Sequence, residues 1–373
     1  MDVVVTIVAF LAVLVILVLV HELGHFVVAK LAGITVQEFG VGFPPRLASV
    51  TWRGTRYSIN AIPLGGFVKM LGEDGEIEAE RMRERGLSER EIDAAMVGAF
   101  NRKPIPVRLA VLFAGVAMNF LLAVVLFAWA FSVPQPVSVP PVTVTRVQAD
   151  SPAVGRLEVG DQIVSADGRS FDRTTDLVDY IAAHAGSPVT LQVVRDGRNL
   201  DVAVTPRQLT EEQRRAGMGA IGFALTSTVE MSSPRANGPI DAIVSSVRVT
   251  GEIAWAIPGG LAQTVAGLIG LAPNTGEARG PIGIAQATGE MLQEPLFSQL
   301  TFIGLLSVNL AVLNVLPFPP LDGGRIAVTL IEALRRRRLP AEREALIYLT
   351  GFLVLIALVI LISIQDIQRL PGG

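Results

Sequence analysis

The stretch Val18 to Lys30, "VLVHELGHFVVAK", places two histidines and a glutamate inside one of the most apolar runs in the chain. The run from Val3 to about Val28 exceeds the ~20 residues that a helix needs to cross the hydrocarbon core of a bilayer. Ionisable side chains are costly in such a span and by default mark a functional site. The stretch therefore predicts a membrane helix that contributes to a site.

His21, Glu22 and His25 form the pattern H-E-x-x-H. Residues four apart share one face of a helix, so both imidazoles can reach one metal ion. The neighbouring Glu22 can contact a water on that ion without ligating it, and would serve as general base and acid. Zn2+ suits nitrogen and oxygen ligands with one open position. A chance match at a polar helix end is the competing interpretation, and the apolar surroundings argue against it.

Composition points to a membrane protein with soluble parts. Half of the 373 residues are hydrophobic, 17% are charged and the mean hydropathy is +0.51. A soluble domain is nearer a quarter charged. The formal net charge of −3 implies no general attraction to nucleic acid, so no nucleic-acid partner is expected. The absence of cysteine leaves His, Asp and Glu as metal ligands.

Three more apolar runs qualify as membrane spans: about Val107–Phe131, Leu300–Val315 and Ala345–Ile364. The first run could be a signal peptide, but it lacks a basic leader and a small-residue cleavage site, so we expect it to be retained. The short loop between the last two runs is rich in arginine, from Arg335 to Arg338, and short basic loops stay in the cytoplasm. We therefore expect both termini outside and the H-E-x-x-H site toward the cytoplasm.

The segment between the second and third spans contains a predicted α+β domain. Residues Val142–Pro206 alternate with period two, with a hairpin at Asp196-Gly197 and a helix over "TTDLVDYIAAHA". The order resembles a PDZ domain in the permuted bacterial arrangement, on these positions: Ser151-Pro152-Ala153, Leu157, Gly160-Asp161, Ile163 and Gly168. The alternative is an unrelated small α+β domain. A PDZ-like domain would bind a peptide or regulator by strand addition at a sheet edge.

Two histidines leave a catalytic zinc site one protein ligand short. Asp322, in "NVLPFPPLDGGRI", is the best candidate for the third. Irregular backbone at membrane depth is tolerated only where protein or a water-filled cavity covers it. The spacing equally allows a simple turn with a helix-capping Asp.

Farther upstream, Ala236–Pro273 is amphipathic but interrupted at Pro258, which favours a membrane-surface segment over a fifth span.

Together, H-E-x-x-H and the pattern N-x-x-P-x-P-x-L-D-G from Asn314 to Gly323 resemble the site-2 protease family of intramembrane zinc metalloproteases. The PDZ-like insertion resembles the bacterial regulator-of-sigma-E protease branch. The resemblance extends to "NAIPLGGFVKMLGED", "NRKPIPVRLAVLFAGVAMN" and "GPIGIA". It implies a multi-pass α-helical membrane protein of about four transmembrane helices, with a membrane-associated β-hairpin and an inserted α+β PDZ-like domain, in a bacterial cell membrane.

The resemblance also implies the roles of single residues. His21, His25 and Asp322 would hold Zn2+, and Glu22 would be the catalytic base. The substrate-binding candidates are Asn314, which would hold the substrate backbone, and three hairpin residues: Gly65, Gly66 and Phe67.

The chain departs from the family's usual patterns at Val116 and Pro44, which puts local geometry in doubt but touches no proposed ligand. The expected parts are residues 1–132 with the first two spans and the hairpin loop, 137–228 as the extracytoplasmic PDZ-like domain, 236–297 as an amphipathic linker at the membrane surface, and 298–373 with the last two spans.

The expected activity is hydrolysis of peptide bonds within transmembrane segments, with anti-sigma factors or remnant signal peptides as candidate substrates and the PDZ-like domain gating access. The partners would be transmembrane substrates and the lipid bilayer. Two rivals are a PDZ-bearing scaffold with a structural metal site and a metal transporter. A structural zinc site needs a fourth protein ligand, and a transporter needs more carboxylates inside its spans than this chain shows.

Overall fold

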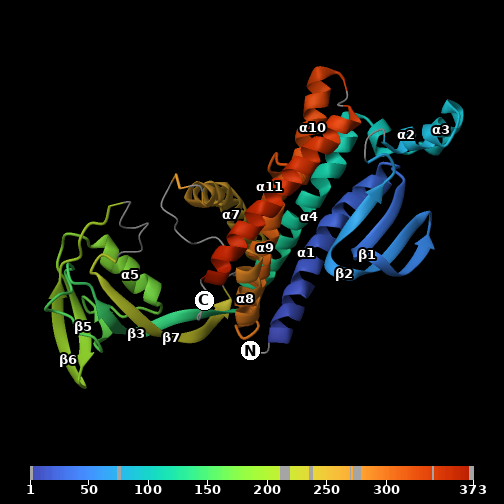
Figure 1. Cartoon of the computed structure of the whole chain (residues 1–373). Helices are drawn as coiled ribbons and strands as arrows, with labels where there is room; N and C mark the ends of the chain where they lie inside the picture. The colour runs from blue at the N-terminus through green and yellow to red at the C-terminus, as the bar shows by residue number, and fades with distance from the viewer. Residues whose placement is uncertain are drawn as a thin grey trace. The chain divides into compact units, whose positions relative to one another are not determined.

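A computed structural model of the chain describes residues 3–73, 77–210, 219–234, 238–268, 270–271, 279–337 and 340–368. The chain divides into two compact units (Figure 1). The helical unit comprises residues 1–132 and 236–373, and the sheet unit comprises residues 133–235. The polypeptide enters and leaves the sheet unit at neighbouring points, because Pro134 pairs with Pro234.

Among the described residues, four helices of the helical unit are long and apolar enough to cross a membrane. They are α1 (Val3–Leu31), α4 (Ile105–Ser132), α9 (Leu296–Val315) and α11 (Ala341–Gln368). All four predicted spans are therefore confirmed as helices. The third begins at Leu296, a little earlier than expected. Shorter elements connect them: α2 (Ile77–Glu84), α3 (Glu89–Ala95), the 3-10 helix η1 (Phe100–Arg102), α8 (Pro281–Met291) and α10 (Asp322–Arg335).

Helix α4 is the centre of the helical unit and packs against α1, α7, α9 and α10. Phe127 is fully buried, and its ring stacks with Phe131 at a centroid distance of 6.3 Å. Gly304 of α9 lets this ring approach, since a Cβ there would lie 3.0 Å from the Phe127 ring. Between membrane helices, such small residues allow the close packing that drives association.

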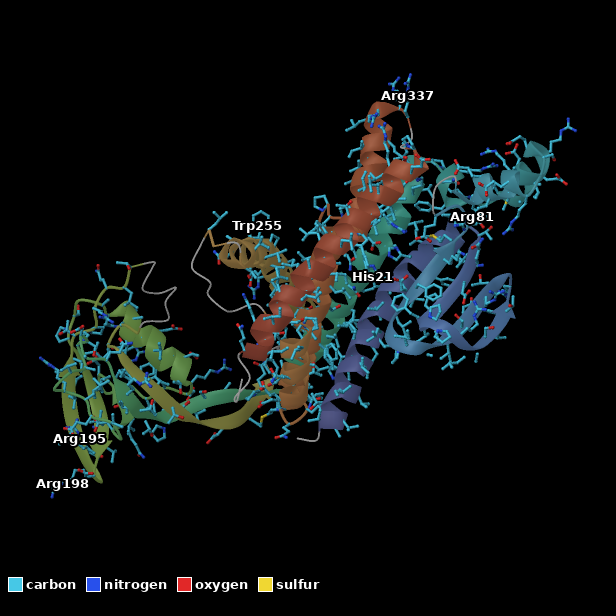
Figure 2. The ribbon with its side chains drawn as sticks, viewed as in Figure 1. His21, Arg81, Arg195, Arg198, Trp255 and Arg337 are labelled. Carbon is cyan, nitrogen blue, oxygen red and sulfur yellow. The ribbon has the colours of Figure 1, made fainter. Side chains whose placement is uncertain are left out.

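Helix α7 (Pro239–Leu268) continues through Pro258. The sequence suggested an interruption there, because proline removes one helical hydrogen bond. The helix is maintained by packing: Val249, Ile253 and Ile257 lie one turn apart and contact the cluster around Phe127. Trp255 of this helix, labelled in Figure 2, is 89% exposed.

A long two-stranded hairpin lies against the second half of α1. It consists of β1 (Val36–Trp52) and β2 (Thr55–Met70), which pair antiparallel with several bulges. The hairpin predicted around Gly65 and Phe67 is thus present. Its base packs against α1 and α4 through Val36, Val68 and Met70. Its outer part leaves large apolar side chains exposed: Leu47, Val50, Trp52, Ile59, Ile62 and Leu64.

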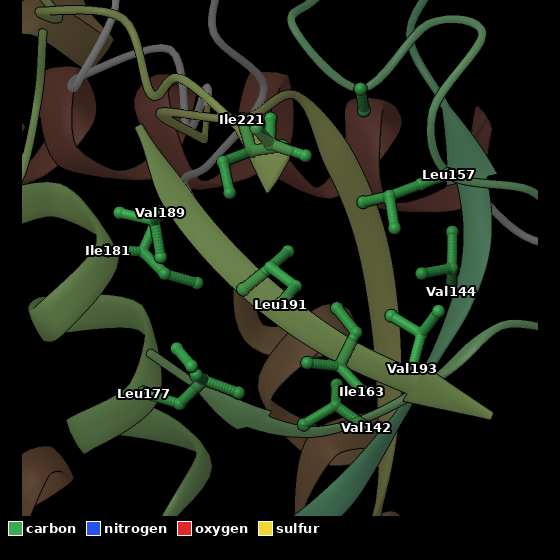
Figure 3. Close-up of a cluster of buried hydrophobic side chains, with 13 residues drawn as sticks. Val142, Val144, Leu157, Ile163, Leu177, Ile181, Val189, Leu191, Val193 and Ile221 are labelled. Atoms are coloured by element: carbon green, nitrogen blue, oxygen red, sulfur yellow. The ribbon is translucent and has the colours of Figure 1, made fainter. Parts of the chain in front are cut away.

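The sheet unit contains an antiparallel five-stranded sheet in the order β6-β5-β4-β3-β7. The strands are β3 (Pro134–Val147), β4 (Gln162–Ala166), β5 (Val189–Arg195), β6 (Arg198–Val204) and β7 (Phe223–Pro234). Helix α5 (Thr174–Ala183) contributes Leu177 and Ile181 to a core of buried aliphatic residues (Figure 3). The α+β character, the helix and the hairpin at Asp196-Gly197 are as expected, whereas β7 was not predicted.

Candidate active site

The H-E-x-x-H residues lie within α1, close to its carboxyl end. His21 and His25 are each 6% exposed and are one helical turn apart. Their Nε2 atoms are 3.1 Å from each other, and the rings meet edge to face. Because both imidazoles leave the same face of the helix, the two nitrogens point at one place.

Asp322 completes a group of three donors. Its Oδ2 lies 2.8 Å from His21 Nε2 and 3.1 Å from His25 Nε2, although the residues are about three hundred positions apart in sequence. One donor atom from each of the three lies within 4.8 Å of the others. The helix-capping alternative for Asp322 is wrong, since Leu321 is the N-cap of α10 and no side chain caps that helix end.

Two glycines after Asp322 explain why it can reach α1. A Cβ at Gly323 would lie 2.1 Å from the Leu316 carbonyl oxygen, and a Cβ at Gly324 would lie 2.8 Å from the Pro319 nitrogen. Any larger residue at either position would force the loop between α9 and α10 apart. The close packing of this loop places Asp322, at the start of α10, next to the histidines of α1.

The space between the ligands is left open by a third glycine. At Gly115 of α4, an added Cβ would lie 2.4 Å from His25 Nε2 and 2.7 Å from His21 Nε2. Gly24 of α1 likewise faces the Ala114 carbonyl, which an added Cβ would approach to 2.3 Å. The backbones of α1 and α4 therefore approach closely, and Gly115 lies directly against the Nε2 atoms of the two histidines.

Both histidines have a second partner that orients the ring. His25 Nδ1 lies 2.8 Å from the Val111 carbonyl oxygen and donates to it, which leaves Nε2 as the free ligand atom. His21 Nδ1 lies 3.2 Å from Nδ2 of the fully buried Asn119. The sequence did not assign Asn119 a role. The signal was available, because a polar residue in the middle of a membrane span usually has a function.

Glu22 is placed beside the hairpin and outside the group of three donors. A Cβ on Gly66 of β2 would lie 3.8 Å from Glu22 Cγ and 3.0 Å from a methyl group of Leu19. Gly65 has a positive φ of 134°, a conformation that glycine alone adopts readily, and faces Val18. Gly65 and Gly66 thus lie next to the H-E-x-x-H helix, whereas the ring of Phe67 stacks on Phe43 within the hairpin.

Asn314, the substrate-binding candidate in α9, is hydrogen-bonded to its own helix. Its Nδ2 donates to the Leu310 carbonyl oxygen one turn earlier in α9, at 3.0 Å. Its side chain is half-buried. In this conformation the amide is satisfied by its own helix.

A second link joins the hairpin to α10. Arg325, one turn after Asp322, forms an ion pair with Glu73, which follows β2 and also accepts the Met70 N–H at 3.1 Å. Burial by itself would lower the pKa of Arg325, but the Glu73 carboxylate holds it above its ordinary value. The pair fixes the start of α10 to the end of the hairpin.

The residues present fit zinc. Two neutral imidazoles and one carboxylate form the donor set of a catalytic zinc site with three protein ligands. The glycine at position 115 leaves the space that an ion would need between them. A metal site among apolar helices defines the class as a membrane metalloprotein with a H-E-x-x-H peptidase motif.

Comparison with known proteins places the chain within that class. The profile of peptidase family M50 matches residues 9–358, and the chain belongs to this family. It is 32% identical over 370 residues to Atu1380 of Agrobacterium fabrum, which is named as a zinc metalloprotease, covering 98% of this chain and 96% of that protein. The regulator of sigma-W protease RasP of Bacillus subtilis is 28% identical over 429 residues, covering 98% and 99%. The chain is accordingly a zinc metalloprotease, and Zn2+ is its cofactor.

Part of the chain is similar to solved PDZ domains. The PDZ domain of an SdrC-like protein from Listeria innocua is 27% identical, with a TM-score of 0.21, covering 24% of this chain and 96% of that one. A PDZ domain from Listeria monocytogenes gives 26% identity and the same TM-score, covering 24% and 92%.

Proposed function

We propose that His21, His25 and Asp322 hold the zinc ion and that Glu22 is the general base and acid of an intramembrane peptidase. The observation that carries this proposal is the convergence of three donor atoms within 4.8 Å, two from α1 and one from the start of α10. A fourth protein ligand, which a structural zinc site would need, is not found in this group among the described residues. This favours catalysis over the scaffold alternative.

The chemistry then divides between metal and protein. A zinc ion held by His21, His25 and Asp322 would supply Lewis-acid polarisation of the scissile carbonyl and a water molecule that is nucleophilic at neutral pH. Glu22 takes the proton from that water and delivers it to the leaving amine nitrogen. Asn119 and the Val111 carbonyl keep the two imidazoles aimed at the ion. Burial of the site among apolar helices limits access of bulk water.

The proposed substrate is a transmembrane segment of another membrane protein. A helix hides its peptide bonds in i to i−4 hydrogen bonds, so it must be unwound before hydrolysis. In β2, the register jumps from Ile62 to Gly66, so Pro63, Leu64 and Gly65 have no paired residue on β1. This unpaired main chain lies beside the H-E-x-x-H helix and offers partners to an extended substrate strand. Gly65, Gly66 and Phe67 would contact that strand, and Asn314 would assist once its amide turns away from Leu310.

The sheet unit is proposed to act as a PDZ-like gate outside the membrane. It would exclude intact proteins with bulky domains and admit substrates that have already been shortened outside the membrane. Anti-sigma factors are proposed as substrates because a relative is named as a regulator of sigma-W protease. Remnant signal peptides are the second candidate class. In this proposal both termini and the sheet unit lie outside a bacterial cell membrane, and Glu22 lies toward the cytoplasm.

The activity is tested with a tagged single-span substrate truncated outside the membrane and reconstituted with the full chain. Wild type should cut within the span, as mapped by mass spectrometry of the products. Glu22→Gln should keep its zinc and lose about 10²–10⁴ in rate, the usual contribution of general acid–base catalysis. Equal cleavage by both proteins would refute the assignment of Glu22.

The gate has its own test. Because Pro134 and Pro234 are paired neighbours, residues 135–233 can be replaced by a short linker without separating the ends. The shortened chain should cleave a substrate that carries a bulky folded domain outside the membrane, whereas wild type should refuse it. Refusal by both, with normal cleavage of the truncated substrate, would contradict the gate.

A further inference from the structure

A basic pocket lies at one end of the helical unit, apart from the zinc site. It has a volume of about 490 Å³ and forms where η1 and the start of α4 meet the end of α10. Figure 2 shows Arg337 at this end, beyond α10 and far from His21. Five cations and one carboxylate are among its lining residues: Arg102, Lys103, Arg108, Arg336, Arg337 and Glu332.

Two of the five cations are neutralised by carboxylates. Arg108 donates through Nη1 and Nη2 to Glu332, at 3.1 and 3.2 Å, and so joins α4 to α10. Arg102 donates to Asp93 of α3 at 2.8 Å. Within the described ranges, the other three cations, Lys103, Arg336 and Arg337, form no ion pair. The pocket therefore presents a concentrated positive charge.

The backbone adds to this charge. The pocket includes Pro104 and Ile105 at the amino end of α4, which is the positive end of the helix dipole, and no acidic residue lies in the first turn. The inference rests on the proposed membrane insertion: α4 is long and apolar enough to span a bilayer, which would place its first turn at the depth of the lipid headgroups. A guanidinium fork matches the oxygens of a phosphate, which makes an organic phosphate the fitting ligand.

The neighbouring surface is apolar. Ile331 and Leu334, in the last two turns of α10, are 44% and 85% exposed. Their neighbour Glu332 bonds Arg108 in the first turn of α4, so these side chains would lie at the level where the proposed span begins. A ligand with a charged head and acyl chains satisfies both the pocket and this apolar flank, whereas a free anion satisfies only the pocket.

We propose that this pocket binds the phosphate headgroup of an anionic phospholipid. Two simpler explanations exist for the arginines: they hold the loop on the cytoplasmic side, or they offset the negative end of α10. Neither explanation requires cations from the start of α4 and the end of α10 to converge on one pocket. The bound lipid would join these two helices beside the existing link between Arg108 and Glu332.

The test uses the purified full chain in micelles of an uncharged maltoside detergent, doped with phosphatidylglycerol or with phosphatidylcholine of the same acyl chains. Lipid retained by the protein is measured by native mass spectrometry. Wild type should retain phosphatidylglycerol in preference to phosphatidylcholine. The triple variant Lys103→Gln, Arg336→Gln, Arg337→Gln should lose roughly 100-fold in affinity for phosphatidylglycerol, since each cation near an anionic lipid contributes about fivefold.

A matched control removes the same charge elsewhere. Arg81, Arg85 and Arg90 are exposed on or beside α2 and α3, and their change to Gln should leave phosphatidylglycerol binding unchanged. Unaltered zinc content verifies that both variants are folded. Equal losses in the two triple variants, or equal retention of both lipids by wild type, would overturn the proposal. Displacement of phosphatidylglycerol by inorganic phosphate alone would also overturn it, because the site would then bind a free anion.

Discussion

Asn119 Nδ2 lies 3.2 Å from Nδ1 of His21, inside a fully buried part of the α1–α4 contact. Asn119 Oδ1 is buried without a hydrogen-bond partner among the described residues. When His21 binds metal through Nε2, its Nδ1 carries the proton and needs an acceptor. If the side-chain amide of Asn119 is flipped, its Oδ1 accepts that proton. The His21 Nδ1–H and Asn119 Oδ1 then both have a hydrogen-bond partner. Asn119 is therefore suited to position the His21 ring.

The first prediction concerns this contact. Asn119→Ala should weaken zinc binding by about 10–100-fold, as loss of such a supporting partner usually does. The measurement is zinc competition against a chelator of known affinity. Asn309→Ala is the matched control, because Asn309 donates only to Leu305 of its own helix, at 3.1 Å, and should bind zinc normally. Equal zinc affinity in the two variants would show that Asn119 does not position His21.

The second prediction concerns the close approach of Gly115 to His21 and His25. Gly115→Ala should abolish zinc binding, because the new Cβ would lie 2.4 Å from His25 Nε2 and occupy the space between the histidines. Zinc content after purification is the readout. Gly251→Ala in α7, where nothing lies within 4 Å, should retain full zinc. A Gly115→Ala protein with full zinc would mean that the ion sits elsewhere.

The third prediction concerns a buried carboxylate that joins α11 to α8. Asp366 is 3% exposed and accepts the backbone N–H groups of Gly280 and Gly283, at 3.1 and 2.8 Å. Asp366→Ala leaves both donors unpaired and should destabilise the helical unit by roughly 1–3 kcal/mol. Asp366→Asn keeps one acceptor oxygen, so its stability should lie between that of wild type and that of Asp366→Ala. Thermal melting in detergent measures the stabilities of the three proteins. Identical melting temperatures of Asp366→Ala and wild type would contradict the prediction.

The fourth prediction concerns acid stability of the sheet unit. The bidentate hydrogen bond from Arg195 to Asp161, at 2.7 Å for both oxygens, holds the pKa of Asp161 below its ordinary value. This contribution to stability is present above the unfolded pKa, which is about 3.9, and is lost as the pH falls through the lower folded pKa. Hydrogen-exchange protection of β5 in the full chain should therefore fall below about pH 4.

The matched variants for acid stability are both Asp→Asn changes. Asp161→Asn should lower the protection of β5 at neutral pH and flatten its fall in acid, because the charged partner of Arg195 is gone. Asp201→Asn, at an exposed position on β6, should behave as wild type. A wild-type acid profile in Asp161→Asn would assign the pH dependence to other groups.

Much of the site was predictable from local patterns. H-E-x-x-H specifies two histidines on one helical face. The Pro-rich stretch before Asp322 makes it identifiable as a candidate third ligand, although Asp322 is itself the first residue of helix α10 and does not lie on the irregular backbone that the sequence suggested. The structure brings His21, His25 and Asp322 together, and their role as metal ligands stays a prediction. The four spans follow from length and hydropathy, which local composition determines.

Other features depend on contacts between distant segments. The partner of Asn119 is set by the register between α1 and α4, which Gly24 and Gly115 fix through backbone approach. Strand β7 was missed because its partner, β3, is about eighty residues earlier in the chain. Helix α7 passes Pro258 because packing on α4 and α9 outweighs the lost hydrogen bond. None of these is visible in a single window of sequence.

In the mechanism that we propose, α1 and α10 share one zinc ion through His21, His25 and Asp322. Its most direct test is the zinc content per chain of Asp322→Ala, measured beside wild type by mass spectrometry of the metal in folded, purified protein. The site predicts one zinc per wild-type chain and nearly complete loss in the variant, because a carboxylate 2.8 Å from His21 Nε2 is removed. A full complement of zinc in folded Asp322→Ala would contradict the claim.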